Sequence, residues 1–247
     1  MSLAKIFGVH AAQSALDYSP EKIKQAWVDQ KRQDDRLQGL IKGLGKKNIG
    51  IQKSDRKQLD NLSKGANHQG IILEVEIPAM RSENDLKEAV EKSKQVPFWL
   101  ILDHIQDPHN LGACLRTADA VGVQGVIVTK DQAVGITPTV CKVASGAAET
   151  VPVYQVTNIS RTISWLKEQD IWVVGAAGEA DKTIYETDIN MPLALVMGAE
   201  EKGMRRLTRE QCDFLVKIPM QGSVDSLNVS VAAGVLMYEA YRQRLGG

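Results

Sequence analysis

Short apolar runs alternate with amphipathic helical patterns along most of the chain, and most regularly from residue 97 onward. The apolar runs predict strands at 98–102, 125–129, 152–156, 171–174, 193–197 and 214–220. Apolar positions spaced three and four apart predict helices at 110–121, 137–150, 159–169, 204–212 and 227–245. Strands that alternate with helices in this way indicate an α/β fold, with a parallel sheet covered by helices on both faces.

The first 77 residues show the same alternation on a smaller scale. Helices are expected at 10–16, 34–47 and 55–62, and strands at 22–28, 48–52 and 69–77. Pro78 ends the last strand, and residues 78–84 have the composition of a linker before a polar helix at 85–94. We therefore expect a small α/β domain at 1–77, a linker and helix at 78–96, and a larger domain at 97–247.

The chain as a whole has no net charge, because its 30 basic residues balance its 30 acidic residues, so only the local distribution of charge is informative. Residues 1–77 hold 13 Lys and Arg against 9 Asp and Glu, so a basic excess lies in the first domain. Cys114, Cys141 and Cys212 form no C-x-x-C pair, which argues against a zinc ribbon and fits a reducing compartment. Neither a signal peptide nor a membrane-spanning apolar run is visible, so we expect a cytoplasmic protein that does not bind membranes.

The first stretch with chemical potential follows the strand expected at 98–102. Asp103, His104, Asp107 and His109 could suggest a metal site, but Pro108 interrupts the group, and three or four converging ligands are needed. We therefore expect no metal. Asn110 and Arg116 lie six residues apart, which does not place them on one helical face. Both could still reach one site if Asn110 lies in the loop before the helix.

Two further stretches follow strands. Gly198 and Gly203 have the spacing of a phosphate-binding loop, but no Lys-Ser/Thr pair follows, and Gly175 and Gly178 lack the G-x-G-x-x-G pattern of a dehydrogenase. The stretch 218–234 predicts a strand end, a loop and a helix that Asp225 or Ser226 could cap. Small residues at 230 and 232–234 would let another backbone come close. The same pattern also suits an ordinary capped core helix.

Taken in this order, the three stretches resemble a known family. They read Asn-x5-Arg at 110–116, Gly-x-Glu-x2-Gly at 198–203, and a third block at 218–232, and the likeness extends to 107–119, 143–149 and 7–10. These blocks are similar to the three motifs of the TrmH/SpoU branch of the SPOUT methyltransferases. The resemblance implies a parallel sheet whose last segments form a deep trefoil knot, and a first domain similar to ribosomal protein L30e that binds RNA. It also implies a homodimer that uses S-adenosylmethionine.

The resemblance also assigns roles to individual residues. Those expected to surround the reacting ribose are Asn110, Arg116, Glu200, Ser226 and Asn228. Those expected to hold the cofactor are Gly198, Ile218, Met220 and Leu227. In this family the motif-one arginine, here Arg116, is proposed as the general base, yet arginine normally stays protonated. Arg116 would otherwise act as a cation, and Glu200 or water would take the proton.

The implied activity is S-adenosylmethionine-dependent 2′-O-methylation of a guanosine ribose in 23S ribosomal RNA. One alternative is a transfer RNA ribose methyltransferase of the same branch. Another is an inactive RNA-binding factor in ribosome assembly, although the complete set of five ribose-site residues speaks against it.

Overall fold

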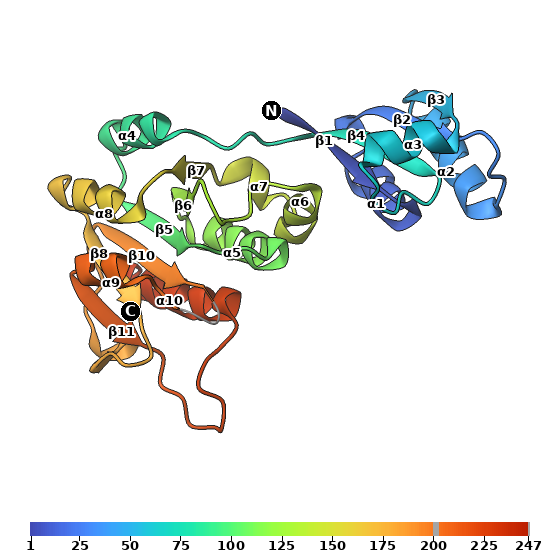
Figure 1. The fold of residues 1–247 in the computed structure, drawn as a ribbon. Helices are drawn as coiled ribbons and strands as arrows, with labels where there is room; N and C mark the ends of the chain where they lie inside the picture. Colours follow the sequence, from blue (N-terminus) through green and yellow to red (C-terminus); the bar gives the residue numbers. More distant parts are fainter. Residues whose placement is uncertain (200–202, 247) are drawn as a thin grey trace. The chain divides into compact units, whose positions relative to one another are not determined.

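The computed structural model describes residues 1–199 and 203–246, and the chain folds as two compact units, Met1–Ala79 and Met80–Gly247 (Figure 1). In the part of the chain so described, no helix is long and apolar enough to cross a membrane.

The first unit is a four-stranded mixed sheet with three α-helices. In chain order its elements are β1 (Ser2–Phe7), α1 (Val9–Tyr18), a 3₁₀ turn (Pro20–Lys22), β2 (Ile23–Asp29), α2 (Asp35–Lys46), β3 (Gly50–Ser54), α3 (Arg56–Ser63) and β4 (Ile71–Ile77). The strand order is β1-β4-β2-β3, where β4 runs antiparallel to β1 and β2, and β3 runs parallel to β2. The sheet therefore has β3 as an outer strand.

Helix α2 shows how the sequence specifies these elements. The Asp34 carboxylate accepts the Leu37 N–H at 3.2 Å and caps the helix. Leu37, Leu40 and Leu44 then recur at spacings of three and four, and all three are fully buried. One capped apolar stripe is therefore enough to form the helix and to dock it.

The second unit holds a seven-stranded sheet in which every pair is parallel. Its elements are α4 (Glu83–Lys92), β5 (Phe98–Asp103), α5 (Pro108–Val121), β6 (Gly125–Thr129), α6 (Pro138–Ala144), α7 (Ala147–Thr150), β7 (Val153–Val156), α8 (Ile159–Glu168), β8 (Trp172–Ala176), β9 (Lys182–Thr183), a 3₁₀ turn (Ile184–Glu186), β10 (Leu193–Gly198), α9 (Arg206–Gln211), β11 (Phe214–Lys217) and α10 (Val229–Arg244). The strand order is β7-β6-β5-β10-β8-β11-β9. The predicted parallel α/β fold is confirmed.

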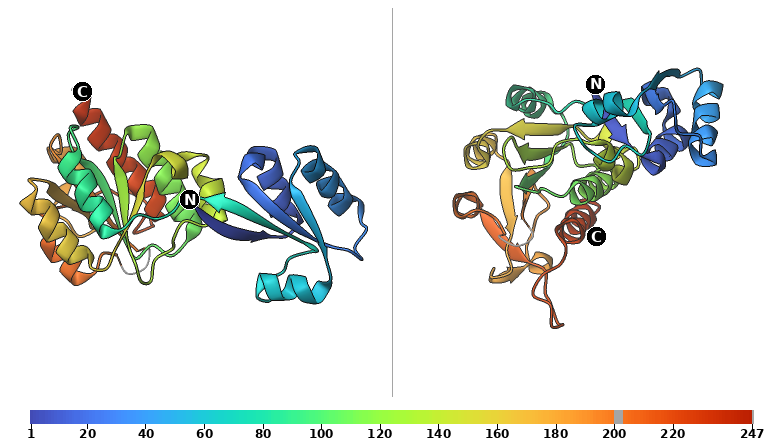
Figure 2. Two further views of the ribbon diagram at one scale, coloured as in Figure 1. Left: turned by 90° about the horizontal axis from the view of Figure 1, so that it is seen from above. Right: turned by 45° about the vertical axis from the view of Figure 1, so that its right-hand side comes forward.

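Helices cover both faces of this sheet. Leu86 of α4 and Ile163 of α8 pack in one core cluster with Trp99 and Ile101 of β5. Side chains alternate along a strand, so Phe98 and Leu100 point to the opposite face. There α10 packs on β10 and beside α5, as both views of Figure 2 show.

The single helix expected at 137–150 is wrong in one respect. It is divided into α6 and α7, because Ser145 and Gly146 adopt left-handed conformations with φ of 51° and 98°. Just before this break, α6 packs closely against α5. A Cβ on Gly112 of α5 would lie 2.7 Å from the Cβ of Val143 in α6. Only glycine at 112 allows α6 to pack so near.

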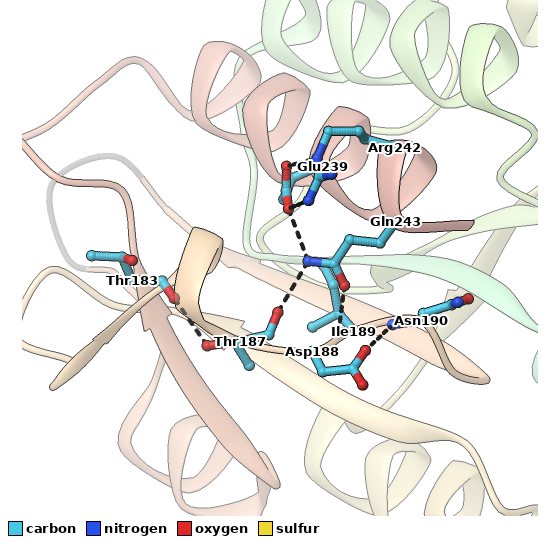
Figure 3. A network of polar contacts seen from close by, with 8 residues as sticks. All are labelled: Thr183, Thr187, Asp188, Ile189, Asn190, Glu239, Arg242 and Gln243. Carbon is cyan, nitrogen blue, oxygen red and sulfur yellow. Dashed lines mark hydrogen bonds and ion pairs between the residues drawn. The ribbon is translucent and has the colours of Figure 1, made fainter. Parts of the chain in front are cut away.

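The C-terminal end of α10 is fastened to the segment before β10 (Figure 3). The Gln243 side-chain amide donates to the Thr187 carbonyl at 3.1 Å, and its oxygen accepts the Ile189 N–H at 2.8 Å. Glu239 is buried, and Arg242 donates to both of its carboxylate oxygens, at 2.9 and 2.8 Å. Ion pair and amide together fix the last two turns of the helix.

Arg244 extends the same anchor to the start of β5. Its guanidinium donates to the carbonyls of Pro97 at 2.7 Å and Met191 at 2.8 Å, and lies 4.4 Å from the centre of the Phe98 ring. These contacts hold α10 against the sheet.

Candidate active site at the carboxyl ends of the strands

Three of the predicted site stretches leave neighbouring strands at the same edge of the sheet. Strands β5, β10, β8 and β11 are adjacent, Gly198 ends β10 directly opposite Asp103 of β5, and Val216 pairs with Ala176 of β8. Ligands of open parallel sheets bind outside such carboxyl ends. The geometry therefore supports a site here.

Gly198 lies where the chain turns back tightly on itself. A Cβ at this position would lie 2.1 Å from both the Gly203 carbonyl carbon and the Met204 nitrogen. The Ala199 N–H donates to the Gly203 carbonyl at 3.1 Å, and the Gly203 N–H donates back to the Ala199 carbonyl at 2.8 Å. The spacing of the two glycines thus reflects a loop whose ends are joined, with no room for a side chain at 198.

Asp103 joins this loop to the one after β5, and sequence reasoning missed that role. Its side chain is 1% exposed, accepts the Arg205 N–H at 3.0 Å and pairs with Nδ1 of His104. His104 has a φ of +66°, unusual for a residue other than glycine. An acidic residue at the end of a buried strand was the only sign of this role in the sequence. The contact itself could not be predicted, because Arg205 lies 102 residues away.

One of the acidic residues after β5 has a structural role. Asp107 caps α5 by accepting the His109 N–H at 2.8 Å. Within residues 1–199 and 203–246, no group of three His, Cys, Asp or Glu side chains is arranged to hold a metal ion.

Asn110 and Asn228 meet at the start of two helices. The Asn228 side-chain amide donates to the Asn110 oxygen at 3.0 Å, and Asn110 is 5% exposed. Asn228 also caps α10, because its oxygen accepts the N–H of Ser230 at 2.9 Å and that of Val231 at 3.4 Å. The predicted cap at Asp225 or Ser226 is therefore wrong, since the helix begins at Val229.

Asn110 lies within α5, not in the loop before it. Pro108 begins the helix directly after the Asp107 cap, which leaves Asn110 in the first turn. α10 runs alongside in the same direction, and a Cβ on Gly234 would lie 3.9 Å from Cγ2 of Thr117. The small residues of α10 therefore do allow a close approach, as the sequence suggested.

Among residues 1–199 and 203–246, no hydrogen bond joins the side chain of Arg116 or Ser226 to this asparagine pair. Both side chains are exposed. Six residues separate Arg116 from Asn110 along α5, so they lie on different faces of the helix. Glu200 lies outside the described residues.

Of the predicted cofactor residues, Gly198 ends β10 and Ile218 directly follows β11, whereas Met220 and Leu227 lie farther along the chain toward α10. Gly198, Ile218 and Leu227 are partly buried, and Met220 is 37% exposed. Figure 1 shows the chain between β11 and α10 extending away from the sheet edge as a long loop. Met220 and Leu227 lie on this loop and Ile218 begins it.

The thiols of Cys212 and Cys114 are only weakly acidic. Burial, reinforced by the Asp213 carboxylate, raises the pKa of the Cys212 thiol to about 12, and burial alone does the same for Cys114. Both remain protonated at neutral pH and are poor nucleophiles.

Family models match both units of the chain. The model described as the SpoU rRNA methylase family matches residues 97–238, and the one described as RNA 2′-O ribose methyltransferase substrate binding matches residues 5–80.

Curated relatives extend over almost the whole chain. The 23S rRNA (guanosine-2′-O-)-methyltransferase RlmB of Shewanella oneidensis is 54% identical, with 97% of each chain covered. The protein of the same name from Pseudomonas aeruginosa is 52% identical over 97% of this chain and 96% of its own. That of Escherichia coli K12 is 53% identical over 97% and 98%.

Solved structures show the same fold. The SpoU methyltransferase AviRb from Streptomyces viridochromogenes, in complex with AdoMet, has a TM-score of 0.68 and 25% identity over 99% of this chain and 91% of its own. A TrmH/SpoU tRNA modifying enzyme from A. aeolicus has a TM-score of 0.57 and 30% identity, and covers 66% of this chain and 84% of its own. With one family model matching more than half of the chain and relatives above 50% identity over nearly all of it, this protein belongs to the SpoU rRNA methylase family.

Proposed function

We propose that this protein transfers a methyl group from S-adenosylmethionine to the ribose 2′-oxygen of a guanosine in 23S ribosomal RNA. The observation that carries the proposal is full-length identity of 52–54% to proteins named for that reaction. The converging strand ends and the asparagine pair give a place where the reaction can occur.

The residues at the strand ends suit S-adenosylmethionine, which is also bound in the related AviRb complex. Gly198 lets the backbone of Gly203 and Met204 lie directly against the end of β10, and Ile218, Met220 and Leu227 offer apolar surface for an adenosine. The sulfonium, when bound, supplies a methyl group activated for displacement.

The chain must then align the ribose hydroxyl and remove its proton. Asn110 and Asn228 are fixed by their mutual hydrogen bond, and a rigid polar pair can orient the ribose, with Ser226 on the adjoining loop. Arg116 grips an RNA phosphate and stabilises the developing alkoxide as a cation. In this assignment Glu200 or water takes the proton. The competing assignment makes Arg116 itself the base, which requires a large decrease in its pKa.

We also propose that the last segments of the second unit form the trefoil knot of this family. Two features support this: β11 lies beyond β8, on the side away from β10, and the chain nevertheless returns afterwards to place α10 on β10 and α5. That return path passes the strands that the chain has already formed.

The exposed face of α10 supports a homodimer. Val231, Tyr238 and Leu245 are 52%, 52% and 69% exposed, and Tyr241 stacks edge-on against Tyr238 with ring centres 6.3 Å apart. Apolar side chains gathered on one helix face favour a contact with a second subunit.

Residues 1–77 would bind the RNA as an L30e-like domain, 78–96 would connect, and 97–247 would carry the reaction in the cytoplasm, as proposed from the sequence. The substrate-binding family model supports this division. The related tRNA modifying enzyme covers 66% of this chain, whereas the rRNA-modifying relatives cover 97%. That difference favours ribosomal over transfer RNA.

The test is tritium transfer from labelled S-adenosylmethionine to protein-free 23S ribosomal RNA, with transfer RNA assayed in parallel and the labelled nucleotide mapped by nuclease digestion. Label in a 2′-O-methylguanosine of 23S RNA is expected. Label in transfer RNA alone would overturn the substrate, and an absence of both label and cofactor binding would favour the inactive assembly factor.

A further inference from the structure

The basic residues of the first unit gather at one edge of its sheet. Between positions 36 and 57 the chain holds seven Lys and Arg and a single acidic residue, Asp55, whereas the rest of residues 1–79 holds six basic and eight acidic residues. The seven lie on α2 and its C-cap, on the outer strand β3 and in the first turn of α3, and all are exposed: Arg36, Lys42, Lys46, Lys47, Lys53, Arg56 and Lys57. We call this set the basic edge.

The charges of the basic edge are not neutralised within the unit. Across the residues that the structure describes, no ion pair or side-chain hydrogen bond involves any of the seven, and Asp55 is engaged as the cap of α3, accepting the Gln58 N–H at 2.8 Å. Two lysines on β1 and β2 are instead paired with glutamates of β4. Lys24 lies 2.8 Å from Glu76 and Lys5 lies 3.6 Å from Glu74.

Two of these cations stand where they oppose helix stability. Arg56 and Lys57 occupy the first turn of α3, which carries no acidic residue. The N-terminal end of a helix is its positive pole, so cations there are unfavourable. A binding role for them outside the unit explains why they occur at this position.

Two glycines of helix α2 are not required by packing. Gly39 and Gly45 face solvent, and a Cβ at either position would meet nothing within 4 Å. Alanine would stabilise the helix more than glycine, so packing does not require these glycines. Gly39 lies one turn from both Arg36 and Lys42, where the lack of a side chain lets another backbone come close.

We propose that the basic edge binds the phosphate backbone of the ribosomal RNA substrate, and that Lys5 and Lys24, which are paired with glutamates, do not. Unpaired cations on an exposed surface match phosphates, which supply much of the affinity of nucleic-acid complexes. The inference rests on the proposed function, because it assigns a surface to the substrate of that reaction.

Paired double substitutions in the full chain test it. Lys53→Gln with Lys57→Gln removes two unpaired charges from the basic edge, and Lys5→Gln with Lys24→Gln removes the two lysines that are paired with glutamates. The control leaves two glutamates unpaired, so an effect of overall charge would weaken its RNA binding at least as much. The measurement is the Kd for a protein-free 23S ribosomal RNA fragment between 50 and 200 mM KCl, with S-adenosylmethionine affinity as a check on folding.

The edge variant is expected to bind RNA about three- to tenfold more weakly. A plot of the logarithm of its association constant against the logarithm of the salt concentration should have a slope that is less negative by about one to two. The control should keep the wild-type slope. Equal weakening of both variants, or of neither, would overturn the basic edge while wild-type methyl transfer to 23S RNA leaves the proposed function intact. A wild-type protein that fails to methylate would refute the function on its own, whatever the two variants do.

Discussion

Gly198 has no space for a side chain. The carbonyl carbon of Gly203 and the nitrogen of Met204 both occupy the space of a Cβ at 2.1 Å. We expect Gly198→Ala to displace the loop after β10 and to reduce S-adenosylmethionine affinity at least about tenfold, a loss of roughly 1.4 kcal/mol. Calorimetric titration of the full-length variant measures this.

Gly45→Ala serves as the comparison for that substitution. Its Cβ would meet nothing within 4 Å and its backbone is helical, so cofactor affinity should stay at the wild-type value and stability should rise by up to about 1 kcal/mol. Wild-type cofactor affinity in Gly198→Ala would show that the joined loop does not shape the site.

Arg116 is exposed, and a planar guanidinium there can engage phosphate oxygens with two donors at once. Arg116→Lys keeps the charge but loses this geometry, so methyl transfer should fall by about one to two orders of magnitude while cofactor binding is unchanged. Single-turnover rates across a pH series provide the measurement. Near wild-type turnover throughout would count against both the two-donor grip of the planar guanidinium and the arginine base.

At the scale of elements, α10 connects the site to the rest of the sheet, and the ion pair formed by its buried Glu239 makes that connection sensitive to acid. Hydrogen bonds from Arg242 and Gln243 lower the pKa of Glu239 below its ordinary value. A lowered folded-state pKa stabilises the fold above the unfolded-state value of about 4.3, and that contribution disappears as the pH falls through the folded-state pKa.

Glu239→Gln should therefore be less stable than wild type at pH 7, and the difference should close as the pH falls below the unfolded-state pKa of about 4.3 and through the lowered folded-state pKa. Urea unfolding at a series of pH values tests this. Glu210→Gln removes an exposed partner of Arg206 and should show little difference at any pH. A gap for Glu239→Gln that stays constant into acid would mean that its ionisation does not stabilise the helix.

Most elements were predictable because each carries its own apolar period and cap, as α2 does. The sequence did not reveal β1, in which Lys5 lies between the apolar Leu3 and Phe7 and whose partner β4 lies 65 or more residues away. Periodicity also misplaced the core side of α10. Val231 and Tyr238 of the predicted stripe are exposed, while Ala233, Leu236 and Met237 are buried. A helix that is apolar on both sides gives no preferred direction.

The candidate site was predictable only as far as local spacing and resemblance reach. The glycine positions of the loop after β10 and the small residues of α10 could be read from the chain. The Asp103 contact with Arg205 and the Asn110–Asn228 bond could not, because each joins residues more than 100 positions apart.

For the whole molecule, the exposed face of α10 should determine the oligomeric state. Tyr238→Glu places a charge in that face and should convert a dimer to a monomer, as measured by light scattering during gel filtration. Tyr185→Glu is a matched comparison, since Tyr185 is similarly exposed (54%) but lies outside α10. A dimeric Tyr238→Glu variant would place the subunit contact elsewhere.

The division into two units predicts separable binding functions. A chain lacking residues 1–79 keeps every strand of the seven-stranded sheet, so it should fold and bind S-adenosylmethionine with unchanged affinity. Its affinity for 23S RNA should fall by about tenfold or more, because the basic edge is lost. Filter binding against the full chain is the measurement, and equal RNA affinity would assign recognition to the second unit.

The fastening of α10 also has a consequence for protein synthesis. Arg244 bonds to Pro97 across 147 positions, and Asn228 bonds to Asn110 across 118. Folding proceeds unit by unit from the N-terminal side while a chain is being made, so the first unit can form early. The asparagine pair cannot form until α10 has left the ribosome. We therefore expect a nascent chain to gain its RNA-binding surface well before it gains a methyltransferase site, so that a partly made enzyme can hold ribosomal RNA but cannot yet modify it.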